Sequence, residues 1–197
     1  MATDQAEVST AAPSKKMEGR LLACGGALGV SRAFFREGDE ELENATSMFV
    51  RLLTLGFKHW SPVCIAAACR SVGLAVTSSD CSSCSDVAEG QGADLPQLVT
   101  LATRELTAAV AHKTPEVKES ALYAMKQLGR VLPDATVMSV SNTMMPPVLA
   151  LLRSNNARMK GPCERAARHV LLGRKVADVD SGEDSAAGVL AGIERGG

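Results

Sequence analysis

The only pair of residues whose spacing is typical of metal binding or thiol exchange is Cys81-Ser-Ser-Cys84. Tetrahedral zinc takes four ligands, so these two cysteines need two more ligand residues at a credible distance. The sequence has no second Cys-x-x-Cys and no His-x-x-x-His, and His59, His112 and His169 are far apart along the chain. We therefore expect no metal site and no redox centre, and we interpret the segment around Cys81 as an inserted surface loop.

The titratable residues do not form a catalytic pattern either. Helical-repeat enzymes with a di-iron centre use His-Glu pairs, because imidazole and carboxylate ligands suit iron, but the histidines here precede Trp60, Lys113 and Val170. No Gly-rich phosphate loop follows a strand, and no Ser/His/Asp or Cys/His grouping stands out. We interpret four acidic residues as solvated helix faces: Glu41, Glu43, Glu105 and Glu119. We expect a protein that is not an enzyme and binds no cofactor.

The strongest charge feature is a basic stretch from residue 153 to residue 175, with seven basic residues against Glu164 alone. Arg158 and Lys160 fall near a predicted helix start, where the helix dipole disfavours each cation by about 0.3–1 kcal/mol. A bound anion or an acidic partner would reverse that cost. The candidate partner-binding residues are Arg153, Arg158, Lys160, Arg165 and Arg168.

Three interpretations of this basic stretch stay open. It could contact an acidic protein surface or RNA phosphate, or it could be a solvated basic face that the acidic residues 178–184 partly neutralise. No aromatic residues alternate with the cations, so base stacking is not indicated.

Composition indicates the class of fold. The 197-residue chain is 46% hydrophobic but only 3% aromatic, so its core must be built mainly from Ala, Leu, Val and Met, which favours close-packed helices. The net charge of −1 gives no overall attraction to DNA or to an anionic membrane. The first ten residues lack the apolar run of a secretory signal, and the longest apolar run, residues 63–69, is too short to span a bilayer. We expect an all-α cytoplasmic protein with reduced cysteines, four of which lie within apolar helical patterns.

Residues 113–130, KTPEVKESALYAMKQLGR, predict one amphipathic helix. Thr114 suits the N-cap, Pro115 the first helical position, and Glu116 the positive end of the helix dipole. One apolar stripe at helical spacing consists of Val117, Ala121, Ala124, Met125 and Leu128. We expect the helix to bury this face.

The same stripe recurs along the chain. Counted 42 residues after the 113–130 segment, it falls on Met159, Cys163, Ala166, Ala167 and Val170. Counted 53 residues before that segment, it falls on Cys64, Ala68, Ser71, Val72 and Ala75. A weaker copy at residues 18–28 places Cys24 and Ala27 on the small positions, 44 residues before Ala68 and Ser71. Second helices between the copies also align, Leu53 with Leu106 and Val148, and Leu55 with Ala108 and Ala150.

A period near 42 residues is typical of HEAT and armadillo arrays. We therefore predict a HEAT/armadillo-like α-solenoid of about three helix pairs preceded by one unpaired helix. The expected helix pairs are about 40–76, 94–131 and 137–172, and the unpaired helix is about 17–35. The unpaired helix has an open edge that a tail, a partner or the rest of a longer array would cover, and self-association through this edge stays open.

The domain boundaries follow from the same pattern. We expect the helical repeat domain at residues 17–173, with a loop insertion at about 77–92. Residues 1–16 and 174–197 lack a clear apolar period, so we expect them to be disordered tails.

Two long segments carry a more specific resemblance. They are GADLPQLVTLATRELTAAVAHKTPEVKESALYAMKQLGRVLPD and NTMMPPVLALLRSNNARMKGPCERAARHVLL. Together with WSPVCIAAACRSVGLAV at residues 60–76, they resemble the C-terminal HEAT repeats of the large general-control translational activators, in the same order of units. That family's proteins are many times longer, and the Cys-Ser loop and Pro162 depart from its pattern, so no functional residue of the family can be placed on a numbered position here.

The resemblance implies a cytoplasmic, non-catalytic scaffold that works with ribosomes and with the starvation-responsive kinase of translation initiation factor 2 alpha. We therefore expect a repeat protein that presents a protein-binding surface in translational control. The alternative is a stand-alone HEAT-repeat adaptor or assembly chaperone unrelated to translation.

Overall fold

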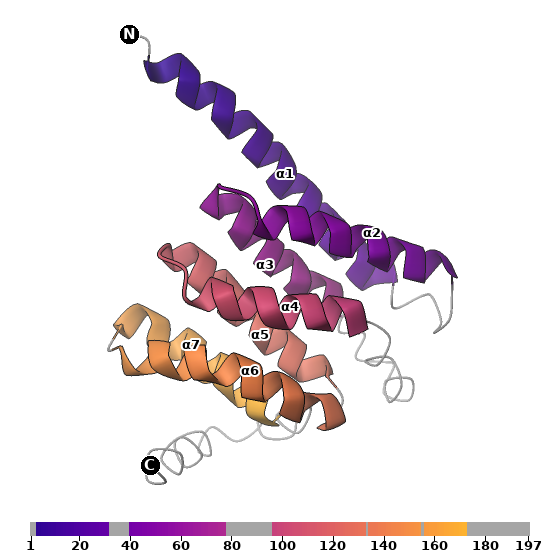
Figure 1. Ribbon diagram of the computed structural model, residues 1–197, viewed down its shortest axis with the longest axis vertical. Helices are drawn as coiled ribbons and strands as arrows, with labels where there is room; N and C mark the ends of the chain where they lie inside the picture. Colours follow the sequence, from indigo (N-terminus) through magenta and orange to yellow (C-terminus); the bar gives the residue numbers. More distant parts are fainter. Residues whose placement is uncertain (1–2, 32–39, 78–95, 133, 155, 173–197) are drawn as a thin grey trace.

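The computed structural model describes residues 3–31, 40–77, 96–132, 134–154 and 156–172. In these residues there are seven α-helices and no strand, which confirms the all-α prediction for this part of the chain (Figure 1). The helices are α1 (Thr3–Ser31), α2 (Glu40–Phe57), α3 (Pro62–Val76), α4 (Pro96–Val110), α5 (Pro115–Val131), α6 (Asp134–Arg153) and α7 (Ala157–Leu172).

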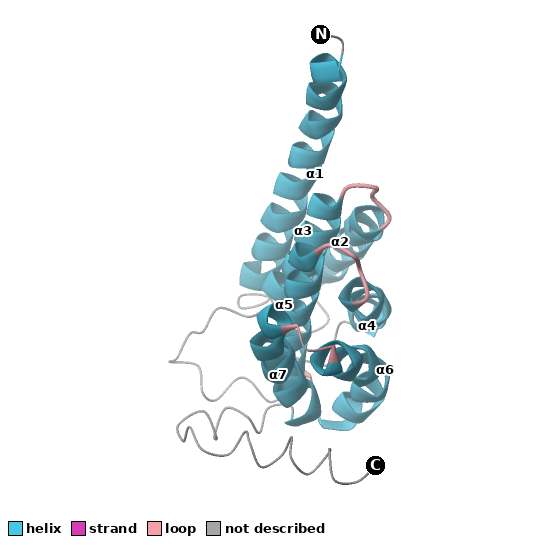
Figure 2. Cartoon of the chain, turned by 90° about the vertical axis from the view of Figure 1, so that its left-hand side faces the viewer, coloured by secondary structure: helices cyan, strands magenta, loops and turns pink. Residues whose placement is uncertain are grey.

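The helices lie in two layers. Helices α1, α3, α5 and α7 stack side by side in one layer, which we call the odd-helix layer, and α2, α4 and α6 form the even-helix layer against it (Figure 1, Figure 2). Each consecutive pair, α2/α3, α4/α5 and α6/α7, contributes one helix to each layer. The expected helix pairs are therefore present, at 40–76, 96–131 and 134–172. This arrangement is compatible with an α-solenoid.

Two equivalent turns connect the layers at α3 and α5. Ser61 and Thr114 occupy the N-cap positions, each followed by proline, but neither side chain makes a capping hydrogen bond. Instead their backbone N–H groups donate to histidines two residues earlier, Ser61 to Nδ1 of His59 (3.1 Å) and Thr114 to Nδ1 of His112 (3.0 Å). Two of the three histidines therefore fix turns.

The stripe positions of α3, α5 and α7 form the centre of the core. All fifteen side chains at these positions are at most 2% exposed. Because most of them are Ala, Val, Met, Cys or Ser, the helices approach closely, and each larger apolar side chain contributes roughly 1.5–3 kcal/mol by its burial. The predicted burial of this helix face is confirmed.

The alignment of the even helices is also visible in their burial. Leu53, Leu106 and Val148 are fully buried. The second aligned set, which includes Ala108 and Ala150, is exposed, and Leu55 is 60% exposed. Within each set the residues occupy corresponding positions of α2, α4 and α6, but only the first set faces the odd-helix layer.

Helix α1 follows a different register from the expected one. We expected Cys24 and Ala27 on the buried side, but both are exposed. From Leu21 onward the buried residues of α1 are Leu21, Gly25, Leu28 and Gly29, which correspond to the α3 stripe at an offset of 43 residues, not 44. The reason is close packing, since a Cβ atom at Gly25 would lie 2.6 Å from the carbonyl oxygen of Ser71. Glycines therefore take the positions that small side chains take elsewhere.

The start of α1 also differs from the prediction. We expected residues 1–16 to be a disordered tail and the helix to begin at about 17, whereas the structure has helix from Thr3 onward. Ala, Glu and Gln in this segment favour helix, although its polarity resembles that of a tail. Ser14 is buried, and its carbonyl oxygen accepts a hydrogen bond from the thiol of Cys64 at 3.4 Å.

The other tail and the loop lie outside the described residues. These are residues 78–95, which contain Cys81 and Cys84, and residues 173–197. The structure therefore does not test the predicted loop insertion or C-terminal tail. None of the described helices combines the length and apolar character that a bilayer span requires.

Candidate partner-binding surface

The cysteines and histidines of the described residues do not assemble a reactive centre. No group of three or more His, Cys, Asp or Glu side chains in this part of the chain is placed to hold a metal ion. Burial raises the pKa of Cys69 to about 12 and that of Cys163 to about 11, and it also raises the pKa of Cys64. These thiols stay protonated near neutral pH and pack as small apolar groups. Cys24 is exposed.

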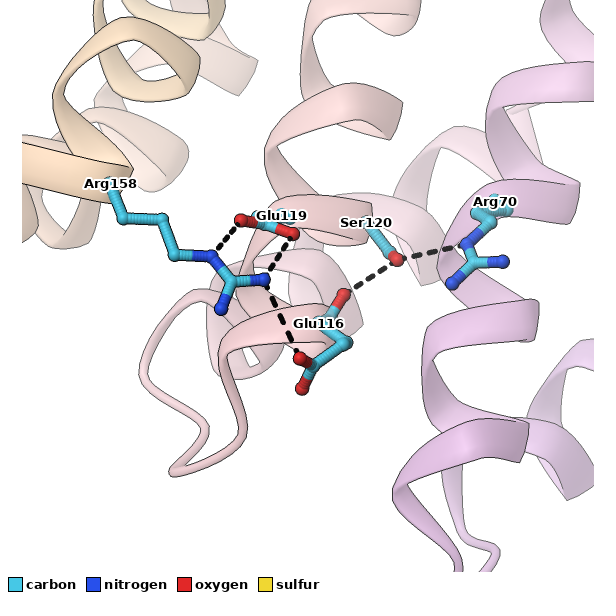
Figure 3. Close-up of polar contacts among 5 residues, drawn as sticks. All are labelled: Arg70, Glu116, Glu119, Ser120 and Arg158. Carbon is cyan, nitrogen blue, oxygen red and sulfur yellow. Dashed lines mark hydrogen bonds and ion pairs between the residues drawn. The ribbon is translucent and has the colours of Figure 1, made fainter.

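Of the predicted basic residues, Arg158 has a role that the sequence interpretation missed. Its guanidinium is bound by Glu119 of α5, with Nε 2.6 Å from Oε1 and Nη2 3.1 Å from Oε2 (Figure 3). Nη2 also lies 3.5 Å from Oε1 of Glu116. The hydrogen bonds and charge of Glu119 raise the pKa of Arg158. Arg158 is therefore not a free cation, because its charge is neutralised within the chain and links α7 to α5.

The other four predicted residues lie on two helices. Arg153 is in the last turn of α6, in the even-helix layer, while Lys160, Arg165 and Arg168 are on α7. Lys160 and Arg165 are exposed and Arg168 is half-buried. The basic stretch is therefore divided between the two layers.

The register of the repeats places the exposed arginine of α7 in line with residues of other helices. Offsets of 43, 53 and 42 residues connect Ala27 of α1, Arg70 of α3, Tyr123 of α5 and Arg165 of α7. All four are exposed. We call this line across the odd-helix layer the arginine–tyrosine row.

A hollow lies beside this row. Its volume is about 380 Å³, near the lower end of the range for ligand pockets, roughly 300–1,000 Å³. Residues of α1, α3 and α5 line it: Leu22, Arg70, Leu74, Glu116, Glu119, Ser120 and Tyr123. The sequence interpretation named none of these as a binding residue, although the repeat offsets would have aligned Arg70 and Tyr123 with Arg165.

A glycine positions the aromatic ring of this hollow. A Cβ atom at Gly73 of α3 would lie 2.6 Å from Cε1 of Tyr123, so the ring packs directly on the α3 backbone. Tyr123 is nevertheless 39% exposed. The ring therefore forms an apolar wall that stays accessible.

A short hydrogen-bond chain positions the cation. Ser120 Oγ donates to the carbonyl oxygen of Glu116 (2.7 Å) and accepts from Nε of Arg70 (3.1 Å), as Figure 3 shows. Among the described residues Arg70 makes no ion pair. The guanidinium is therefore oriented by a neutral hydroxyl, and it keeps its positive charge at the edge of the hollow.

No family model, no curated protein and no solved structure matches the chain. The function must therefore be inferred from the geometry of the surface and from the sequence pattern.

Proposed function

We propose that the protein is a HEAT/armadillo-like solenoid that acts as a non-catalytic scaffold, and that it binds protein partners on the exposed face of the odd-helix layer. The observation that carries this proposal is the arginine–tyrosine row, in which equivalent positions of stacked helices are exposed and carry Arg70, Tyr123 and Arg165. Arginine and tyrosine are enriched among the residues that dominate binding energy at protein interfaces.

The setting that we propose is translational control in the cytoplasm, through ribosome-linked activation of the kinase of initiation factor 2 alpha. Its support is the sequence resemblance of residues 60–172 to the C-terminal repeats of the general-control translational activators. The scaffold would work by holding partners in position, because stacked repeats present an extended surface and need no reactive group.

The setting is tested by co-sedimentation of the full chain with polysomes. We expect the chain to sediment with ribosomes after mild RNase treatment, and the double variant Lys160→Glu, Arg165→Glu to lose this association. Arg158 is left unchanged because it holds α5 to α7. The matched control is Arg51→Glu with Arg104→Glu, two exposed arginines of the even-helix layer, which should sediment like the parent chain.

Failure to sediment with ribosomes would contradict the translational setting and favour the stand-alone adaptor. Sedimentation that survives the α7 double variant would move the contact away from the exposed face of the odd-helix layer.

A further inference from the structure

The charges around the hollow are unevenly compensated, and this difference indicates the chemistry of a ligand. Arg158 pairs with the carboxylates of Glu116 and Glu119, so at this end of the hollow one positive charge meets two negative charges. Arg70, at the opposite side, donates to the neutral hydroxyl of Ser120 and makes no ion pair within the described residues. The two arginines and the two carboxylates sum to zero, but the carboxylates are already held by Arg158. Arg70 is therefore the group that can take up a ligand's charge, and a carboxylate can pair with the free edge of this guanidinium in a bidentate geometry.

The rest of the hollow favours an apolar side chain next to that carboxylate. Leu22 of α1, Leu74 of α3 and the ring of Tyr123 of α5 line the hollow together with Arg70. All three side chains are partly exposed. An apolar group seated among them would remove this surface from water at about 25 cal/mol per Å².

The row supplies a second cation at a defined distance. Arg165 of α7 lies two helices beyond Arg70 and is exposed, and it makes no ion pair within the described residues. With neighbouring helix axes about 8–10 Å apart, the axes of α3 and α7, which carry the two arginines, are about 16–20 Å apart. An extended peptide advances about 3.3 Å per residue, so it covers this distance in about five or six residues.

We propose that this surface binds an extended acidic peptide segment of a partner protein. One carboxylate pairs with Arg70, an adjacent apolar side chain lies among Leu22, Leu74 and Tyr123, and a second carboxylate pairs with Arg165. The inference rests on the proposed function only because it assumes a protein partner, and it does not require the ribosome.

RNA fits the same surface less well. A phosphate backbone gains affinity from many cations, whereas the row has two, Arg70 and Arg165. Single-stranded RNA also uses aromatic rings as stacking platforms, and the row contains one ring, Tyr123.

The first experiment identifies the peptide without a known partner. A phage-displayed library of random peptides is selected on the full chain. We expect enrichment of sequences in which Asp or Glu is next to Leu, Ile or Phe, with a second acid about six residues away. Enrichment of basic peptides, or of apolar peptides without acids, would overturn the proposal.

The second experiment locates the binding site with an enriched peptide, labelled with fluorescein and measured by anisotropy. Arg70→Glu should weaken binding about tenfold to a hundredfold, because a charge-assisted pair is lost and a repulsion is added. Tyr123→Ala should weaken it by about tenfold. The control Arg51→Glu, on α2, should bind within about twofold of the parent chain, since that residue is in the other layer.

Two further measurements keep the outcome unambiguous. Arg70→Lys preserves the charge but loses the Nε–H bond to Ser120 and the bidentate geometry, so it should fold and bind several-fold more weakly. If Arg70→Glu folds and binds the peptide as tightly as the parent chain, the proposed site is wrong. The proposal is also wrong if single-stranded RNA displaces the labelled peptide more strongly than unlabelled peptide does. Peptide binding without ribosome association would contradict only the translational setting, whereas ribosome association without peptide binding would contradict only this inference.

Discussion

Helix α5 receives an arginine from each of its two neighbours in the odd-helix layer. From α7, Arg158 binds the carboxylates of Glu119 and Glu116, and from α3, Arg70 binds the hydroxyl of Ser120 (Figure 3). Both arginines reach the first two turns of α5, but only the first is neutralised there. Since an arginine that is already neutralised offers little to a ligand, Arg158 holds helices together, and Arg70 is the arginine that we propose binds the peptide.

The α3–α5 junction and the α5–α7 junction each contain a glycine, and the two glycines face different kinds of atom. Gly73 of α3 faces a side chain, the ring of Tyr123, whereas Gly129 of α5 faces backbone atoms of His169 in α7. A side chain can move away from an added atom, and a helix backbone cannot do so without repacking. The α5–α7 junction therefore leaves no room for an added atom, whereas at the α3–α5 junction only the surface ring of Tyr123 would have to move aside.

The largest expected effect tests the buried face of α5, the helix that takes part in both junctions. Ala121 of α5 is fully buried, so Ala121→Arg places an unpaired charge in the core and should cost more than about 4 kcal/mol of unfolding free energy. We expect the variant to be unfolded by circular dichroism. Lys126→Glu on the same helix is the control and should melt within a few degrees of the parent chain. Equal melting temperatures for the two variants would refute the assignment of this helix face.

The second prediction separates the junctions by stability. Gly129→Ala should lower the free energy of unfolding by about 2 kcal/mol, because its Cβ has no room beside the α7 backbone. Gly73→Ala should change it by less than about 1 kcal/mol, since the ring can swing away and alanine favours helix. Urea unfolding of both variants measures the difference.

The two glycine variants should also differ in binding. Gly73→Ala displaces the ring of Tyr123 and should weaken the acidic peptide, whereas Gly129→Ala leaves the hollow unchanged at temperatures where it is folded. If both variants lose equal stability, or if neither affects the peptide, the contrast between the junctions does not hold.

The third prediction concerns stability at alkaline pH, where two buried thiols with different pKa values lose their protons. Burial raises the pKa of Cys69 in α3 to about 12 and that of Cys163 in α7 to about 11, from an ordinary value of 9.0. The pKa values of both thiols are higher in the folded state than in the unfolded state. The stability that the neutral thiols contribute is therefore complete below pH 9 and is lost as pH rises through the folded pKa values. Cys69 alone should remove about 1.4 kcal/mol per pH unit above pH 9, and the contribution of Cys163 should level off earlier.

Urea unfolding at about pH 8 and about pH 10 checks this slope. The comparison is between the parent chain and Cys69→Ala, which lacks the thiol but keeps the other alkaline titrations. A parent slope no steeper than that of Cys69→Ala would contradict the prediction.

The repeat stripe could be predicted because it depends on a local signal. A buried helix face repeats every three or four residues, and the same pattern at offsets of 42 and 53 residues identified side chains that are all buried. The register of α1 was harder to predict because Gly25 and Gly29 carry no hydropathic signal. Their role depends on how closely α3 approaches, which only the packed structure shows.

The site could not be predicted from charge runs along the chain. Arg158 belongs to a basic stretch, but its partner Glu119 is 39 residues away and becomes a neighbour only when α5 and α7 stack. Arg70 stands outside any basic stretch, and Tyr123 is a single aromatic residue on an otherwise polar helix face. The repeat offsets connect both residues with Arg165, and this signal lies in the exposed positions of the repeats, not in the buried ones.

The smallest expected effect comes from Glu119→Gln, which makes the arginine of the α5–α7 junction resemble the unpaired arginine of the α3–α5 junction. Glu119→Gln removes the main partner of Arg158 and leaves it with Glu116 at 3.5 Å, so the hollow gains most of a positive charge. We expect the acidic peptide to bind about two- to fivefold more tightly at low ionic strength, and we expect this gain to disappear at high salt because exposed charges are screened.

The matched control for this last variant is Glu105→Gln. Glu105 pairs with Arg104 at 2.6 Å on α4, so this substitution also releases one arginine, but in the even-helix layer. If both variants tighten binding equally, the gain comes from net charge alone and the row has no special role. If Glu119→Gln alone does so, neutralisation of Arg158 is what separates the arginine that holds helices from the arginine that binds.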